Sequence, residues 1–342
     1  MNDLILFGIE KIILISAVIG ITLGIAMYST LAERKFAAFF QDRLGPERAG
    51  PFGLLQPLAD GIKFFFKEEF IPEKSDKFLF ILAPGLAILA SCMTLAVIPW
   101  GKTLVLFGRD ISLQIVDLNI GMLYVFGVVS LGVYSIMIGG WASNNKYSLL
   151  SAIRASSQMM SYELAMGLSL ISVIMLTGTL SLKGIVAAQT GFHWLIFIQP
   201  LGFLIFFICS LAETNRTPFD LAECETELVG GYHTEYSSMK LGLFLFAEYI
   251  NMFVASAIMA TLYFGGTNFP GLGHLHVSPN VLTLIGTGLL FAKIFFFIFL
   301  FIWIRWTFPR FRYDQLIRLG WKILLPLAII NMIVTGGLAL LL

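Results

Sequence analysis

Charged residues are scarce in this chain of 342 residues, because Asp, Glu, Lys and Arg make up only 13% of it while 58% is hydrophobic. A soluble domain is typically about a quarter charged and about half apolar. No single water-soluble core of this length could bury so much apolar surface, whereas a membrane can. The composition therefore predicts an integral membrane protein.

Cysteine and histidine are also rare, and their placement argues against several cofactors. The three cysteines, Cys92, Cys209 and Cys224, have no CxxC spacing, so neither a disulfide framework nor an iron–sulfur cluster is indicated. A haem held between helices would need histidines inside spanning helices, but all four histidines fall in predicted loops. His274 and His276 could touch a metal, although an HxH pair in a turn is more often ordinary polar loop.

Motifs for nucleotides and nucleic acids are missing as well. The sequence has no Walker A motif and no GxGxxG after a strand. Its net charge of +1 argues against a nucleic-acid partner, which would need a basic stripe. We therefore expect this chain to bind no haem, flavin, iron–sulfur cluster, metal or nucleotide.

Long apolar runs are what the sequence does contain, and a helix needs about 20 mostly apolar residues to cross a bilayer. The runs cover residues 4–31, 78–99, 118–140, 158–178, 195–213, 239–265, 282–304 and 320–341. Most lysines and arginines lie in the odd-numbered loops, which places those loops inside and both termini outside. The prediction is an all-α membrane protein, 1–342 forming one membrane domain with eight spans.

Residues 54–69 are predicted to form an additional, amphipathic helix. Polar side chains recur there at spacings of three and four, and apolar ones occupy the opposite side. The polar positions are Gln56, Asp60, Lys63 and Lys67. Such a helix is expected to lie in the membrane interface rather than to span.

Ionisable residues within the apolar runs are the strongest functional signal, since each costs about 2.5–3.5 kcal/mol at a helix centre. Glu163 lies in the fourth run, Glu213 closes the fifth, Glu248 lies in the sixth and Lys293 in the seventh. One buried Glu–Lys pair holding helices together would explain one acid but not three. The pattern favours a proton or ion relay over structural pairing.

An acidic inner loop, 214–238, follows the fifth run and contains Arg216. Carboxylates crowd this loop and its start: Glu213, Asp220, Glu223, Glu225, Glu227 and Glu235. Crowded carboxylates raise the pKa of one another, which suits a proton-exchanging site. Two alternatives remain open, an ordinary solvated loop and a divalent-cation site with oxygen ligands.

Four stretches at the inner loops and helix ends carry a family resemblance, and one of them contains Glu33-Arg34-Lys35. They are AERKFAAFFQDRLGPERAGPFGLLQPLADGIKFFFKEE (32–69), GWASNNKYSLLSAIRASSQMMSYE (140–163), AETNRTPFDLAECETELVGGYHTEYSSMK (212–240) and RWTFPRFRYDQL (305–316). Through them the chain closely resembles the H-subunit family of respiratory complex I, the proton-pumping NADH-quinone oxidoreductase. The resemblance covers essentially the whole chain.

This resemblance implies a membrane subunit at the junction of the two arms of complex I. Its partners would be the peripheral-arm quinone-site and iron–sulfur subunits, neighbouring small membrane subunits and the lipid bilayer. Its substrate would be a quinone, ubiquinone or menaquinone, entering between the first span and the amphipathic helix. The headgroup would move along a chamber towards an iron–sulfur cluster in a partner. The chain would belong to a translocase, with no catalytic residue or redox centre of its own.

The resemblance, together with the buried and crowded charges, assigns roles to individual residues. The predicted quinone chamber comprises Arg34, Asp60, Lys63, Glu213, Arg216, Phe219, Asp220, Glu223 and Glu225. The predicted proton relay comprises Glu163, Glu213, Glu227, Glu235, Glu248 and Lys293. Two positions depart from the family pattern, because Glu47 stands where Asn is usual and Cys224 where Gly is usual.

Two other functions compete with this interpretation. One is the equivalent membrane subunit of an energy-converting hydrogenase, which the intact RLGPERAGPFG and ETNRTPFDL stretches disfavour. The other, more distant, is a stand-alone ion carrier, which has no reason for long docking loops. A bacterial cytoplasmic (inner) membrane is favoured over a mitochondrial one.

Overall fold

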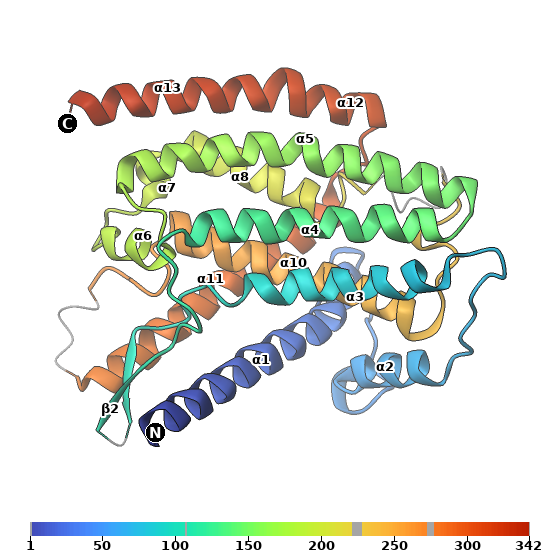
Figure 1. The fold of residues 1–342 in the computed structure, drawn as a ribbon, viewed down its shortest axis with the longest axis horizontal. Coiled ribbons are helices and arrows are strands. Elements are labelled where there is room, and N and C mark those ends of the chain that lie inside the picture. Colours follow the sequence, from blue (N-terminus) through green and yellow to red (C-terminus); the bar gives the residue numbers. More distant parts are fainter. Residues whose placement is uncertain (1, 107, 221–227, 272–276, 342) are drawn as a thin grey trace.

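The computed structural model describes residues 2–106, 108–220, 228–271 and 277–341 as a bundle of long helices (Figure 1). The long helices are α1 (Asn2–Phe40), α3 (Lys77–Thr94), α4 (Gly121–Ala142), α5 (Lys146–Thr177), α8 (Pro200–Glu213), α10 (Ser238–Tyr263), α11 (Pro279–Thr307) and α13 (Leu325–Leu341). Helices α3, α4, α5 and α13 run side by side across Figure 1, while α1 and α11 are inclined to them. The predicted helical class is confirmed.

Short elements connect these helices. They are η1 (Pro51–Gly53), α2 (Gln56–Phe66), α6 (Leu182–Ala188), α7 (Leu195–Ile198), η2 (Gly231–His233), α12 (Tyr313–Arg318) and the π-helical turn η4 (Leu319–Leu324). Helix α2 lies within the range 54–69 predicted for the amphipathic helix.

Within the described residues, seven helices are long and apolar enough to cross a membrane. The predicted fifth crossing, 195–213, is instead divided between α7 and the 14-residue α8. The division falls at Pro200, which has no N–H and occupies the first position of α8, where a helix tolerates proline best. A count of eight spans therefore depends on α7 and α8 crossing together.

Two helices extend beyond their apolar runs at the end that is predicted to lie inside. Helix α1 continues past residue 31 to Phe40, through Ala, Glu, Arg and Lys residues that favour helix. Helix α5 begins at Lys146 rather than near residue 158, where the Asn145 side chain caps it by accepting a hydrogen bond from the Tyr147 N–H (2.9 Å). A search for continuous apolar runs misses these polar helical turns. Their charged side chains therefore lie on helices and not in loops.

The described residues also contain one short β-hairpin, which the sequence-based prediction did not include. Strands β1 (Thr103–Leu106) and β2 (Arg109–Ser112) pair antiparallel, and Gly108 in the turn has φ +75°. Residues in the hairpin and just after it contact two charged side chains of α1, Glu10 and Lys11. Arg109 lies 3.8 Å from the Glu10 carboxylate, and Lys11 donates to the Gln114 and Ile115 carbonyls (3.0 and 2.8 Å).

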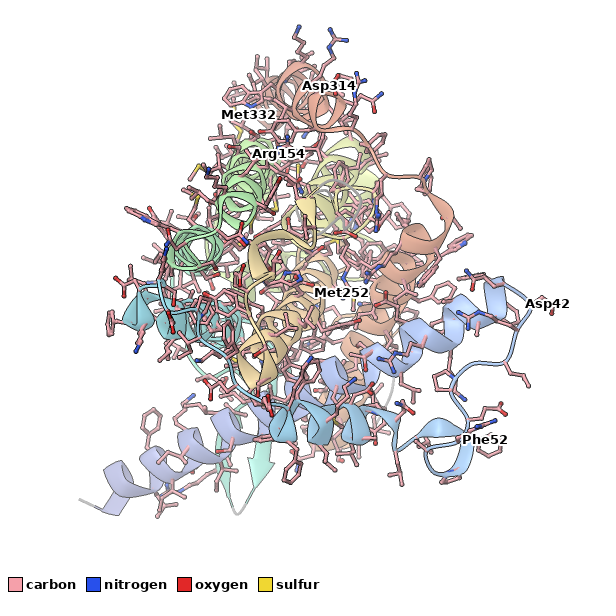
Figure 2. The ribbon with its side chains drawn as sticks, turned by 90° about the vertical axis from the view of Figure 1, so that its right-hand side faces the viewer. Asp42, Phe52, Arg154, Met252, Asp314 and Met332 are labelled. Atoms are coloured by element: carbon pink, nitrogen blue, oxygen red, sulfur yellow. The ribbon has the colours of Figure 1, made fainter. Side chains whose placement is uncertain are left out.

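Helix α10 forms the centre of the bundle. Of its most apolar stretch 61% is buried, compared with 22% for α1 and for the C-terminal helix. Met252 of α10 is fully buried and lies in the middle of the molecule in Figure 2, whereas Asp42 and Phe52 mark the outlying segment between α1 and α2. The polar residues of α10 are therefore positioned to connect groups on many other helices.

Candidate functional site

A cleft of about 510 Å³ lies between α1, α2, α10 and α11. Most of its wall is apolar, with Met27, Phe64, Leu243 and Phe246 among the lining side chains. Charged residues also line it: Glu33, Arg34, Asp60, Lys63 and Arg305. An apolar hollow with a few convergent polar groups is typical of a site for a largely apolar ligand.

Helix α2 lines this cleft with charged Asp60 and Lys63 and with apolar Phe64 and Phe65, and exposes further apolar side chains on its other side. Asp60 pairs with Arg34 of α1 at 2.8 Å, and Lys63 lies 3.9 Å from the same carboxylate. On the other side, Ile62 is 57% and Phe66 87% exposed. The structure thus brings together the three chamber residues predicted on α1 and α2, and leaves an apolar surface suited to lipid or to a partner.

A buried ion cluster adjoins the cleft, centred on Glu33. The Glu33 carboxylate pairs with Arg216 (2.7 Å) and Arg305 (2.6 Å) and accepts a hydrogen bond from the Tyr249 hydroxyl (2.9 Å). Glu33 is 5% exposed and Arg216 3% exposed. Breaking such a buried pair from one side is costly, because the other charge stays buried without compensation.

Arg216 is held in this cluster as a permanent cation. Burial alone would lower the pKa of Arg216, but the Glu33 carboxylate and other neighbours outweigh burial and raise that pKa above its usual value. Its guanidinium carbon also lies 4.3 Å from the centre of the Tyr249 ring. Its Nε and Nη2 atoms have no hydrogen-bond partner within the described part of the chain.

Glu33 and Arg305 were missed by the sequence-based assignment. The first apolar run was ended at residue 31, so Glu33 counted as a loop residue next to anchoring basic side chains. In the structure Glu33 lies inside the continuous helix α1 and is buried. The signal that could have identified Glu33 was its position two residues after an apolar run, where the helix can continue.

Four of the predicted chamber residues do not line the cleft: Glu213, Arg216, Phe219 and Asp220. Phe219 is 2% exposed and packs edge-on against Tyr162, with ring centres 5.3 Å apart. Asp220 is also buried and lies 3.3 Å from Arg310. The predicted site residues Glu223, Glu225 and Glu227 lie outside the described residues.

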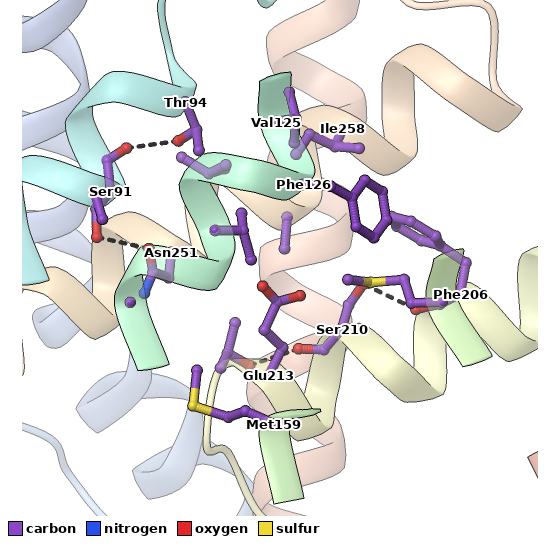
Figure 3. A pocket seen from close by; sticks show the side chains of 17 residues that line it. Ser91, Thr94, Val125, Phe126, Met159, Phe206, Ser210, Glu213, Asn251 and Ile258 are labelled. Atoms are coloured by element: carbon purple, nitrogen blue, oxygen red, sulfur yellow. Dashed lines mark hydrogen bonds between the residues drawn. The ribbon is translucent and has the colours of Figure 1, made fainter. Parts of the chain in front are cut away.

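Glu213, at the end of α8, projects into a small internal cavity of about 50 Å³ (Figure 3). Side chains of α3, α4, α5, α8 and α10 line it. Glu213 also interacts electrostatically with Glu163 of α5, which accepts a hydrogen bond from the Ser130 hydroxyl of α4. Two of the predicted relay acids are thus neighbours across helices.

A second cavity, of about 30 Å³, joins Glu213 to the third acid. Glu213 and Glu248 both line it. Glu248 accepts a hydrogen bond from the Tyr232 hydroxyl (3.2 Å) and interacts electrostatically with Arg216. The ion cluster at the cleft and the three part-buried glutamates therefore form one electrostatically connected group.

Lys293 and Glu235 are not brought to this group. Lys293 Nζ donates to the carbonyls of Phe264, Gly266 and Asn268 at 2.7–2.8 Å, at the end of α10. Glu235 accepts a hydrogen bond from the Asn145 amide (2.7 Å) and lines a separate hollow of about 340 Å³. Their predicted part in a relay has no support from their position.

A metal site is not apparent in the described residues, where no three His, Cys, Asp or Glu side chains gather as ligands. The divalent-cation alternative for the acidic loop stays open, because three of its carboxylates lie outside those residues.

A bundle of membrane-length apolar helices around a buried set of charges is the architecture of a multi-pass membrane protein. The chain belongs to the NADH dehydrogenase family, whose sequence profile matches residues 12–336. It is 64% identical to an NADH-quinone oxidoreductase H subunit of Cytophaga hutchinsonii, over 98% of each chain. It is 62% identical to the corresponding H subunit of Flavobacterium johnsoniae, over 98% of this chain and 96% of the relative. An H subunit of Geobacter sulfurreducens is 50% identical, over 97% of each chain. The predicted family is confirmed.

Proposed function

We propose that this chain is the membrane subunit of a proton-pumping NADH:quinone oxidoreductase that forms much of the quinone-binding chamber and the start of the proton relay. It lies in a bacterial inner membrane, crosses it eight times with α7 and α8 acting as one crossing, and has both termini outside. Its inner loops dock the peripheral-arm subunits, and small membrane subunits lie beside it. The names of the relatives support this function over the hydrogenase and carrier alternatives.

The observation that carries the proposal is the cleft between α1, α2, α10 and α11. A quinone, whether ubiquinone or menaquinone, has a long apolar tail and a small polar headgroup, and the cleft offers apolar walls beside charged residues. The apolar outer face of α2 lets the tail stay in lipid while the headgroup enters. The chain contributes the chamber, and the electrons come from a redox centre in a partner.

The residues connect quinone chemistry to proton movement through electrostatics. Reduction of a quinone takes up two electrons and two protons, so the charge near Glu33, Arg34 and Arg305 changes during the reaction. In a medium of low dielectric constant such a change is felt strongly by buried neighbours. Arg216 contacts Glu33 and interacts with Glu248, so the altered field reaches Glu248, Glu213 and Glu163 in turn.

A bulky side chain placed in the cleft tests its role as the quinone chamber. Gly61 of α2 lines the cleft, and a Cβ there meets no atom within 4 Å, so Gly61→Phe should fold. We expect kcat/KM for a long-tailed quinone to fall about tenfold or more, since overfilling a packed site costs about 1–3 kcal/mol. The measurement is steady-state NADH:quinone turnover of the assembled complex.

Gly85→Phe is the matched control. Gly85 lies on the exposed side of α3 and has equally open surroundings, but it does not line the cleft. Parent-level quinone kinetics in both variants would contradict the proposed chamber.

A further inference from the structure

Asn251 of α10 lines both of the cavities that adjoin Glu213. It follows Glu248 by three residues, so both side chains lie on one face of the helix. Asn251 and Glu213 line both the 50 Å³ and the 30 Å³ cavity, while Glu248 lines only the smaller one. Asn251 is therefore part of the wall that the two cavities share, together with Glu213.

Both cavities have room for water. A site needs about 10–15 Å³ to hold one water molecule, and the water needs several polar partners. The carboxylates of Glu213 and Glu248 and the amide of Asn251 supply such partners around the smaller cavity, and Glu213 and Asn251 do so around the larger one. An amide does not itself carry a proton at neutral pH, so it can take part only by orienting water or a carboxylate.

The Asn251 amide is fixed by a contact from another helix. Ser91 of α3 donates from its hydroxyl to Asn251 Oδ1 at 2.6 Å (Figure 3). This contact occupies Oδ1 and leaves the two N–H donors of Nδ2 on the side away from Ser91. An amide held at its oxygen presents a donor-only surface to its surroundings.

We infer that Asn251 is a positioning residue that orders the water between Glu248 and Glu213, with Ser91 holding its amide in the required orientation. The inference rests on the proposed proton relay and deepens it, because it assigns the water-filled step between two of the acids to a neutral side chain. The donors of Nδ2 point the oxygen of a neighbouring water, or a carboxylate oxygen, towards Asn251. The water hydrogens are then left to connect the acids.

Variants of Asn251 test this role in the assembled complex. Asn251→Leu should lower both NADH:quinone turnover and the protons pumped per electron, roughly tenfold or more, since a hydrogen bond to a charged group is among the strongest. The ratio of turnover in H2O to turnover in D2O should also change, which a purely structural role would not produce. Asn251→Gln keeps the donors and should recover part of the pumping.

A matched serine pair keeps the test decisive if Asn251→Leu fails to assemble. Ser91 and Ser256 are both buried, and the hydroxyl oxygen of each lies within 3 Å of a carbonyl four residues earlier in its own helix (2.9 and 2.7 Å), but Ser256 of α10 lines neither cavity. Ser91→Ala should lower the protons pumped per electron, and Ser256→Ala should leave them at the parent level. Equal behaviour of these two variants, or parent-level pumping in Asn251→Leu, would overturn the inference.

Glu213→Gln, measured in parallel, separates this inference from the proposed function. A defective Glu213→Gln beside fully active Asn251 and Ser91 variants would refute the role of Asn251 and leave the relay intact. A fully pumping Glu213→Gln would refute the relay itself.

Discussion

Glu213→Gln should abolish most quinone-coupled activity of the assembled complex while leaving NADH oxidation by artificial acceptors unchanged. Glutamine keeps the shape of the side chain in the cavity but cannot release or take up a proton. A positioned acid or base typically contributes about 10²–10⁴-fold to a rate, so a loss of about a hundredfold is expected. Quinone turnover and proton pumping are the quantities to measure.

The control for this substitution is Asp314→Asn. Asp314 pairs with Arg312 on the exposed start of α12 and lies outside both cavities. Normal pumping in Glu213→Gln, or an equal defect in Asp314→Asn, would argue against a relay through Glu163, Glu213 and Glu248.

Glu33→Gln should have the largest effect on stability. It leaves Arg216, only 3% exposed, without its carboxylate partner. Removing one side of a buried ion pair costs about 3–5 kcal/mol. We expect a lowered thermal midpoint of the purified complex and a smaller yield of assembled complex.

A second substitution distinguishes buried charge from lost packing. The double variant Glu33→Gln with Arg216→Met removes the acid and its more deeply buried cation. It should be more stable than Glu33→Gln alone, because the only cationic partner of Glu33 left without a carboxylate is then Arg305, whose side chain is 30% exposed. By contrast, Asp60→Asn breaks the half-exposed Arg34–Asp60 pair, where about 0–1 kcal/mol is at stake. If the double variant lost as much stability as Glu33→Gln and Arg216→Met lose together, the account of Glu33 as a charge partner would be refuted.

The helices and much of the site could be predicted from the sequence because they depend on local pattern. Apolar runs predicted the long helices, and the polar stripe of residues 54–69 placed Asp60 and Lys63 on one face, where Arg34 meets them. The cost of burying a carboxylate singled out Glu163, Glu213 and Glu248, and the structure brings these together.

Features that depend on packing between distant segments could not be predicted this way. Lys293 lies within an apolar run, as the glutamates do, so the sequence offered no reason to separate it from them. In the folded chain its ammonium group donates hydrogen bonds to three backbone carbonyls just beyond the end of α10. Glu33 became visible only once α1 was seen to continue beyond its apolar run. The hairpin arises from two four-residue strands, too short for their pattern to stand out from an outer loop.

A photoreactive quinone bound to the complex tests the central claim most directly, since it reports where the headgroup and tail lie. After illumination and digestion, the account predicts labelled peptides from α2 and from the Met239–Tyr249 part of α10, with labelling suppressed by excess unlabelled quinone. Competable labelling confined to α5, α13 or other segments outside the cleft, with α2 and α10 unmarked, would contradict the assignment of this cleft as the quinone chamber.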